Sequence, residues 1–296
     1  MDEMSNPPGP EAGFTEKFVE ADGFDIRYRE AGEGPAVVAL HGGGGSRISG
    51  AHALLSENFR VLAVEAPGFG NSAENTRHRT MFEMADTLHA AIAALGIAAF
   101  SIIGNSFGGR LALCMAARNP EPIEALVLVG PAAIREGGAV FEQNLRNILG
   151  VGPAAIREGG AAPGRAEGSH ENMEALMYAH PENMPPIPRP DPEIARKQAA
   201  LIERLHGPDR DEELEARMRE IDTPTLVLLG TEDKLIPPRI GRLYREIMPR
   251  CHVVMIYDAA HAMDAERPEA VASVAGDFIA RRDEFLIKRT DGAIHP

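Results

Sequence analysis

The sequence SIIGNSFGG at residues 101–109 decides the fold. It joins a β-branched run to a Gly-x-Ser-x-Gly motif centred on Ser106, and an amphipathic segment follows from Arg110 to Arg118. A serine in a tight strand-to-helix turn has a strained backbone, so the residues two positions away on each side must be nearly free of side chain, as Gly104 and Gly108 are. The stretch therefore predicts a serine hydroxyl exposed at a sheet edge above a helix N-terminus, with an ordinary turn between strand and helix as the alternative.

The composition is that of a globular protein. The 296 residues, 44% of them hydrophobic, suffice for one large α/β domain or for a domain with an insertion. No apolar run has the length of a transmembrane helix, and we expect residues 1–13, which are acidic and lack the features of a signal peptide, to be disordered. The net charge of −14 argues against nucleic acid or an anionic membrane as a partner. Cys114 and Cys251 lie far apart, which is typical of thiols in a reducing compartment, so we expect a cytoplasmic protein.

Short apolar runs alternate with segments of helical periodicity along most of the chain. Buried strands are expected at Ala36–Leu40, Arg60–Val64, Phe100–Ile103, Ala125–Val129, Thr223–Gly230 and His252–Tyr257. Helices are expected at about Ser49–Glu57, Thr80–Leu95, Pro238–Met248 and Pro268–Arg281, and a hairpin at Phe14–Glu20 and Phe24–Glu30. This alternation predicts a mostly parallel sheet with right-handed crossovers.

Residues 131–221 interrupt the alternation and are predicted to form a helical insertion into a core of residues 1–130 and 222–296. Its helices are expected at about Glu171–His180, Asp191–Leu205 and Arg210–Glu220. The decapeptide GPAAIREGGA occurs twice, at 130–139 and at 152–161. We interpret it as a tandem duplication or a copying fault in the sequence, and expect the second copy to form a mobile loop. Residues 282–296 are expected to form a charged tail.

The sequence HGGGG at residues 41–45 follows the first buried strand directly. Four glycines without Cβ atoms let the backbone approach a ligand and direct its N–H groups at it. A flexible linker is the alternative, but a linker needs neither a strand before it nor a helix after it. We expect His41 to brace this glycine loop through hydrogen bonds.

Three side chains in this order along the chain predict a nucleophile, an acid and a base. Ser106, Asp233 and His261 each follow a predicted strand, and parallel strands place their carboxyl ends at one edge of a sheet. A serine needs a neighbouring base, and that base an orienting acid. Glu232 is the alternative acid, and Asp258 and Asp264 are close to His261 but are expected to cap turns. The expected oxyanion donors are the N–H groups of Phe107 and Gly43.

From about Phe14 to Arg281 the chain resembles the α/β-hydrolase fold family with a helical lid. HGGGGS at 41–46, APGFGNS at 66–72 and GNSFGG at 104–109 are similar to the meta-cleavage-product hydrolases, which cut a carbon–carbon bond in vinylogous 1,5-diketones from aromatic ring cleavage. The resemblance implies a mostly parallel eight-stranded sheet and the Ser106, Asp233 and His261 triad. It also implies a lid arginine that holds the substrate carboxylate, with Arg196 as the nearest match and Arg204 as the alternative.

We further expect Gly42, Gly44, Asn105 and Met263 to contact the substrate, a small organic molecule. The first functional hypothesis is hydrolysis of a carbon–carbon bond in a dienoate diketone. Where many relatives carry a tryptophan after the histidine, this chain has Ala262-Met263, which favours the second hypothesis, a carboxylesterase or lactonase. A ligand sensor with residual hydrolysis is the third. We expect neither a metal nor an organic cofactor, and the sequence leaves the oligomeric state open between a monomer and a homodimer.

Overall fold

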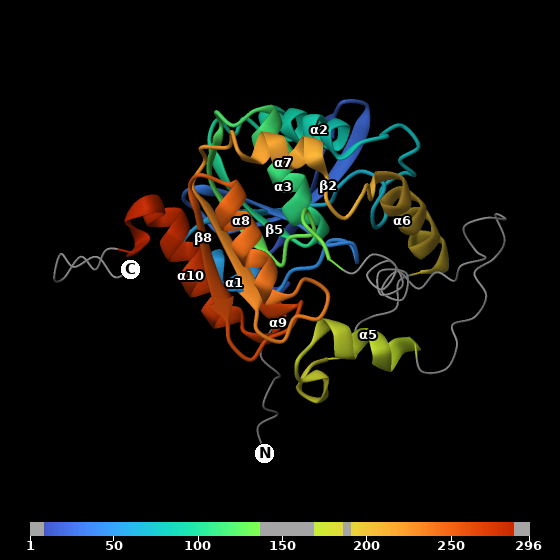
Figure 1. Ribbon diagram of the computed structural model, residues 1–296. Helices are drawn as coiled ribbons and strands as arrows, with labels where there is room; N and C mark the ends of the chain where they lie inside the picture. The colour runs from blue at the N-terminus through green and yellow to red at the C-terminus, as the bar shows by residue number, and fades with distance from the viewer. Residues whose placement is uncertain (1–8, 137–168, 186–190, 287–296) are drawn as a thin grey trace, which may run out of the picture.

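The computed structural model describes residues 9–136, 169–185 and 191–286, and an eight-stranded sheet forms its centre (Figure 1). The strands are β1 (Thr15–Ala21), β2 (Phe24–Ala31), β3 (Ala36–Leu40), β4 (Arg60–Val64), β5 (Phe100–Asn105), β6 (Ile123–Val129), β7 (Thr225–Gly230) and β8 (Cys251–Ile256). Their order in the sheet is β1-β2-β4-β3-β5-β6-β7-β8. The two pairs that β2 forms, with β1 and with β4, are antiparallel and the other five pairs are parallel, so the prediction of a mostly parallel sheet is confirmed.

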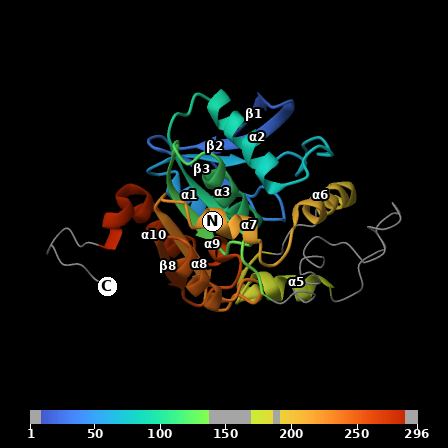
Figure 2. The ribbon, with the colours of Figure 1, turned by 45° about the horizontal axis from the view of Figure 1, so that its top comes forward.

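Both faces of the sheet are covered, because the central strands are apolar on both sides. In β3, Val38 and Leu40 pack in the core under α2 (Met81–Ala94), α3 (Phe107–Arg118) and α8 (Gly241–Ile247). Val37 and Ala39 point the other way, into the core under α1 (Gly50–Leu55) and α10 (Pro268–Arg281). Figures 1 and 2 show these helices on opposite sides of the strands. Successive residues of a strand face opposite sides of the sheet, and here the residues on both sides are apolar. A layer of helices therefore covers each face, which gives three layers.

Among the described residues between β6 and β7, where the sequence predicts an insertion, there are four helical segments. They are α5 (Ser169–Met177), η1 (Pro181–Asn183), α6 (Pro192–Leu205) and α7 (Glu212–Met218). Figure 1 shows α5 and α6 at one side of the sheet. Pro192 at the first helical position and the Asp191 side chain, which accepts the N–H of Glu193, start α6. The expected loop at 152–161 falls outside the described residues.

Buried cations fix the part of the chain that leaves α6. Arg135, which is 3% exposed, donates to the carbonyls of Gly207 and Pro208 over 2.9 and 2.8 Å. Arg110 on α3 pairs with Asp211 over 2.7 Å. Arg135 belongs to the first copy of the repeated decapeptide, so that copy has a structural role at the base of the insertion.

Some boundaries differ from those expected. Residues 9–13 form a turn in which Glu11 pairs with Arg29 over 2.8 Å, so the expectation of disorder is wrong for this part of the N-terminus. The chain after β8 contains a short helix, α9 (Met263–Glu266), and the expected helix at 238–248 divides into η2 (Pro238–Ile240) and α8. The expected tail begins with an ordered turn, η3 (Arg282–Leu286). None of the described helices is long and apolar enough to cross a bilayer.

Candidate active site

Ser106 occupies a strained turn between β5 and α3. Its φ of +50° lies in the left-handed region, where a residue with a side chain is rarely found. A Cβ at Gly104 would lie 2.5 Å from the carbonyl oxygen of Gly108, and one at Gly108 would lie 2.3 Å from that of Leu40. Both glycines are therefore sterically required, as the motif predicts. The N–H of Ser106 donates to the carbonyl of Val129 over 2.9 Å, which fixes the turn against β6.

Asp233 and His261 form a buried pair at the carboxyl ends of β7 and β8. Nδ1 of His261 donates to Oδ2 of Asp233 over 2.9 Å, and the two residues are 7% and 3% exposed. Oδ1 of Asp233 accepts the N–H groups of Leu235 and Ile236, each at 2.8 Å. Burial opposes protonation of the ring, but the charge of Asp233 and its hydrogen bond outweigh burial and raise the pKa of His261.

The alternative acids lie elsewhere. Glu232 is exposed, and Asp258 pairs with His180 and Arg267. Asp264 is buried on α9, close enough for its charge to favour protonation of His261, but it makes no hydrogen bond with that ring among the described residues. Of the four predicted candidates, only Asp233 is hydrogen-bonded to His261.

Gly130 connects the serine turn with the histidine and is a residue that the sequence analysis missed. It follows Val129, the acceptor of the Ser106 N–H, and its φ is +51°. A Cβ at this position would lie 3.2 Å from both Nδ1 and Cε1 of His261. The end of β6 thus contacts the Ser106 turn through Val129 and lies next to the His261 ring at Gly130. Between the Ser106 hydroxyl and the imidazole, the described chain contains no hydrogen bond. The available signal was a glycine placed directly after a buried strand.

The glycine loop lies against Ser106. A Cβ at Gly42 would lie 3.6 Å from Cβ of Ser106, and one at Gly43 would lie 3.3 Å from Cδ1 of Ile202 on α6. The N–H groups of Gly43 and Phe107 donate to no acceptor in the described part of the chain. Phe107 is the first residue of α3, where helix geometry supplies no acceptor for its N–H. This arrangement leaves two donors available near the serine.

His41 braces the loop as predicted. Its Nδ1 lies 2.8 Å from the carbonyl oxygen of Gly42, and its Nε2 accepts the N–H of Ala66 over 3.0 Å. These two bonds require a neutral ring with the proton on Nδ1. Burial lowers the pKa of His41, which favours the same neutral form.

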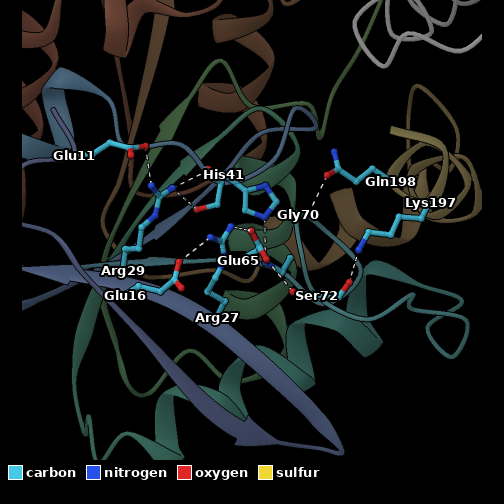
Figure 3. Close-up of polar contacts among 12 residues, drawn as sticks. Glu11, Glu16, Arg27, Arg29, His41, Glu65, Gly70, Ser72, Lys197 and Gln198 are labelled. Atoms are coloured by element: carbon cyan, nitrogen blue, oxygen red, sulfur yellow. Dashed lines mark hydrogen bonds and ion pairs between the residues drawn. The ribbon is translucent and has the colours of Figure 1, made fainter. Parts of the chain in front are cut away.

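A buried carboxylate, Glu65, anchors the chain next to Ala66 (Figure 3). Glu65 is 1% exposed; it pairs with Arg27 and accepts the Ser72 hydroxyl over 2.9 Å. Arg27 also contacts the exposed Glu16 over 2.9 Å. Gly70 has a φ of +49°, and its position leaves no room for a Cβ beside this carboxylate. Glu65 thus holds the residues that orient His41.

Helix α6 reaches this loop from the opposite side (Figure 3). Gln198 is 4% exposed and accepts the N–H of Gly70 over 3.0 Å, and Lys197 donates to the carbonyl of Ser72. Arg204, the alternative carboxylate-binding residue, donates to the carbonyls of Asn75 and His78. It is therefore engaged in fixing α6.

The other predicted substrate contacts differ in position. Oδ1 of Asn105 is buried without a hydrogen-bond partner among the described residues, next to Ser106. Gly44 has no atom within 4 Å of its Cβ position. Arg196 is exposed on α6, which does not support its predicted role. Met263 is fully buried in the core with α1 and α10, so its side chain belongs to the packing of that layer. The described residues contain no cluster that could hold a metal ion.

Comparison with known proteins agrees with this architecture. A hydrolase of 2-hydroxy-6-oxo-6-(2'-aminophenyl)hexa-2,4-dienoic acid from Metapseudomonas resinovorans is 29% identical over 288 residues, which cover 93% of this chain and 94% of the relative. Lipase 3 from a Moraxella species is 27% identical over 268 residues, covering 84% of this chain and 78% of the relative.

A solved meta-cleavage product hydrolase from Pseudomonas fluorescens is 21% identical, with a TM-score of 0.69 over 89% of this chain and 97% of that chain. The family model described as the alpha/beta hydrolase fold matches residues 35–268. The chain therefore belongs to the alpha/beta hydrolase fold family.

Proposed function

We propose that this protein is a serine hydrolase in which Ser106 is the nucleophile, His261 the base and Asp233 the acid that orients the base. The observation that carries the proposal is the buried 2.9 Å bond between His261 and Asp233, at the sheet edge where the strained Ser106 turn also lies. His261 Nε2 accepts the proton of the Ser106 hydroxyl, or of a water, as the oxygen attacks a carbonyl carbon. The resulting imidazolium is stabilised by Asp233.

The negative charge that develops on the carbonyl oxygen is stabilised by the N–H groups of Gly43 and Phe107. A donor of this kind typically lowers the barrier by about 3 kcal/mol, because it is oriented before the reaction begins. The glycines at 42 and 44 allow the carbonyl group to approach the backbone, and the unpaired Asn105 oxygen offers an acceptor to a substrate hydroxyl. These residues together form the proposed reaction centre.

The substrate class we propose is an acidic dienoate diketone from aromatic degradation, of which a carbon–carbon bond is hydrolysed. The names of several relatives, hydrolases of a hexadienoic acid and of 2-hydroxymuconate semialdehyde among them, support this class. One water is consumed: its oxygen ends on the acid formed from the ketone carbon, and its proton ends on the released carbon. That carbon can leave because its electron pair is conjugated with the second carbonyl group.

Carboxylester hydrolysis is the second candidate. The Moraxella lipase supports it, as does a solved bacterial membrane phospholipase A that is 25% identical, with a TM-score of 0.74 over 91% of this chain and 86% of that chain. The exposed position of Arg196 also favours an uncharged substrate, because an arginine that faces solvent does not hold a substrate carboxylate.

A substrate panel distinguishes the two. Wild-type protein and Ser106→Ala are mixed with a 6-aryl-2-hydroxy-6-oxohexa-2,4-dienoic acid and with p-nitrophenyl acetate. We expect kcat/KM for the diketone to exceed that for the ester by about a hundredfold or more, and Ser106→Ala to lose ester hydrolysis by several orders of magnitude. A preference for the ester would select the second candidate. Activity that survives in Ser106→Ala would refute the nucleophile, and absence of turnover with tight binding would indicate a sensor.

A further inference from the structure

The peptide groups on both sides of His261 are hydrogen-bonded outside their own loop. The N–H of Ala260 donates to Oε2 of Glu266 on α9 over 2.7 Å. The N–H of Ala262 donates to the carbonyl oxygen of Met177, the last residue of α5, over 2.8 Å. The backbone that carries the imidazole is thus fixed by Glu266 on one side and by the insertion on the other.

The second carboxylate oxygen of Glu266 contacts the insertion as well. Oε1 accepts the N–H of Ala179 over 2.7 Å and that of His180 over 3.3 Å. An ionised carboxylate has about four acceptor sites, so one side chain can serve all three N–H groups. Because one oxygen faces the His261 loop and the other faces the segment after α5, Glu266 bridges two parts of the chain that are distant in sequence.

Side-chain contacts give the same pairing of segments. Nε2 of His180 lies 2.7 Å from Oδ1 of Asp258, which also pairs with Arg267. Nζ of Lys234, next to Asp233, lies 3.5 Å from the carbonyl oxygen of Ala175. These groups are largely exposed, so their contacts add little to the stability of the fold. They nevertheless show that residues 175–180 lie against the loops that carry Asp233 and His261.

We propose that Glu266 is a positioning residue that couples docking of residues 175–180 to the orientation of His261. The proposal rests on the proposed role of His261 as the base. When residues 175–180 separate from α9, the amide of Ala262 loses its acceptor, the carbonyl of Met177. Glu266 at the same time loses the two amides that hold its Oε1, so its contact with the amide of Ala260 is no longer fixed from both sides. Proton transfer is then efficient only while this part of the insertion is docked.

Glu266→Gln tests the coupling kinetically. The amide keeps the length of the side chain but replaces one acceptor oxygen by an NH₂ group that cannot accept, so one half of the bridge is lost. We expect kcat for p-nitrophenyl acetate to fall about tenfold and KM to stay within about twofold, because the base is displaced and the substrate contacts are kept. Glu269→Gln, the same change at an exposed position on α10, is the control and should change neither. An unaltered kcat in Glu266→Gln would overturn the proposal.

Hydrogen exchange tests the coupling without catalysis, so it separates this proposal from the proposed function. In Glu266→Gln, peptides covering 173–184 and 258–262 should both exchange faster, and peptides from α2 should not. Faster exchange in one segment alone would contradict a shared bridge. If Ser106→Ala kept its activity while both segments exchanged faster, the coupling would stand and the proposed nucleophile would fall.

A measurement on the wild-type chain covers the case in which Glu266→Gln does not fold. Native-state exchange in low urea gives the denaturant dependence of the Ala179, His180, Ala260 and Ala262 amides. We expect all four to respond to urea identically, as one opening unit. Distinct responses for the two pairs would refute the coupling.

Discussion

Nδ1 of His261 lies 2.9 Å from Oδ2 of Asp233, although 28 positions separate the two residues in the chain. β7 and β8 are parallel neighbours, so their carboxyl ends bring both loops to one sheet edge. The second oxygen of Asp233 is held by the N–H groups of Leu235 and Ile236, which fixes the direction in which the carboxylate faces the ring. The pair is therefore oriented before any substrate arrives.

Asp233→Asn should lower kcat/KM for esters by about 10³-fold to 10⁴-fold, because the ring loses both its orientation and its counter-charge. The base must be neutral, and the pKa of His261 is raised despite burial, so the wild-type acid limb should lie above the ordinary histidine value of about 6.5. In Asp233→Asn the limb should move to lower pH. A pH profile of kcat/KM checks this; Glu232→Gln, at an exposed neighbouring position, is the control. An unmoved limb would contradict the electrostatic role of Asp233.

Gly130→Ala should impair both stability and catalysis. The new methyl group would lie 3.2 Å from the His261 ring, and a φ of +51° costs an alanine about 1–2 kcal/mol. We expect a lower Tm and a reduced kcat from a displaced imidazole. Gly276→Ala on α10, where the methyl would meet only ordinary contacts at 3.5 Å, should leave kcat unchanged. Equal kcat values for the two variants would refute the spacing role of Gly130.

Glu65→Gln should destabilise the fold by about 3 kcal/mol, because it leaves Arg27 without its buried partner. Glu16→Gln removes the exposed partner of the same arginine and should cost less than about 1 kcal/mol. Urea unfolding of both variants measures the difference. Similar losses for the two would show that burial of the Glu65 carboxylate is not the decisive feature.

Acidification should destabilise the chain partly through His206. Burial, together with the charges of Arg135 and Arg110, lowers the pKa of His206 to about 4. The unfolded chain takes up this proton near its ordinary pKa of about 6.5, so the unfolded state binds more protons and stability falls as the pH drops from about 6.5 towards about 4. His206→Asn should show a smaller loss of Tm across this window. An identical loss in both proteins would exclude this contribution.

The strands could be predicted because a buried strand is recognised from its own run of apolar residues. β3 and β4 have the predicted limits, since the apolar run of β3 lies between Pro35 and His41 and that of β4 between Arg60 and Glu65. α9 has four residues, too few to show a helical period, and was missed. η3 was hidden by its charged residues, although its Phe285 packs against His252 and Phe278 at 5.1 and 5.2 Å between ring centroids.

Some residues of the candidate site could likewise be predicted from the local sequence, and others could not. The Ser106 turn is specified by its own flanking glycines, so the motif alone predicts it. The need for Gly130 arises from a ring on a distant loop, and Glu266 acts through backbone amides, which carry no sequence signal. Arg196 was expected from the family resemblance, which does not say which side of α6 faces the site. Gln198, two residues further along and about 200° around the helix, is buried, whereas Arg196 is exposed.

Covalent labelling of the nucleophile tests the account most directly. Incubation with a fluorophosphonate ester, followed by intact-mass measurement and peptide mapping, should give one adduct per chain on Ser106. The labelling rate should fall by orders of magnitude in His261→Ala. An adduct on another residue, or labelling of Ser106 at the same rate without His261, would contradict the proposed nucleophile and base.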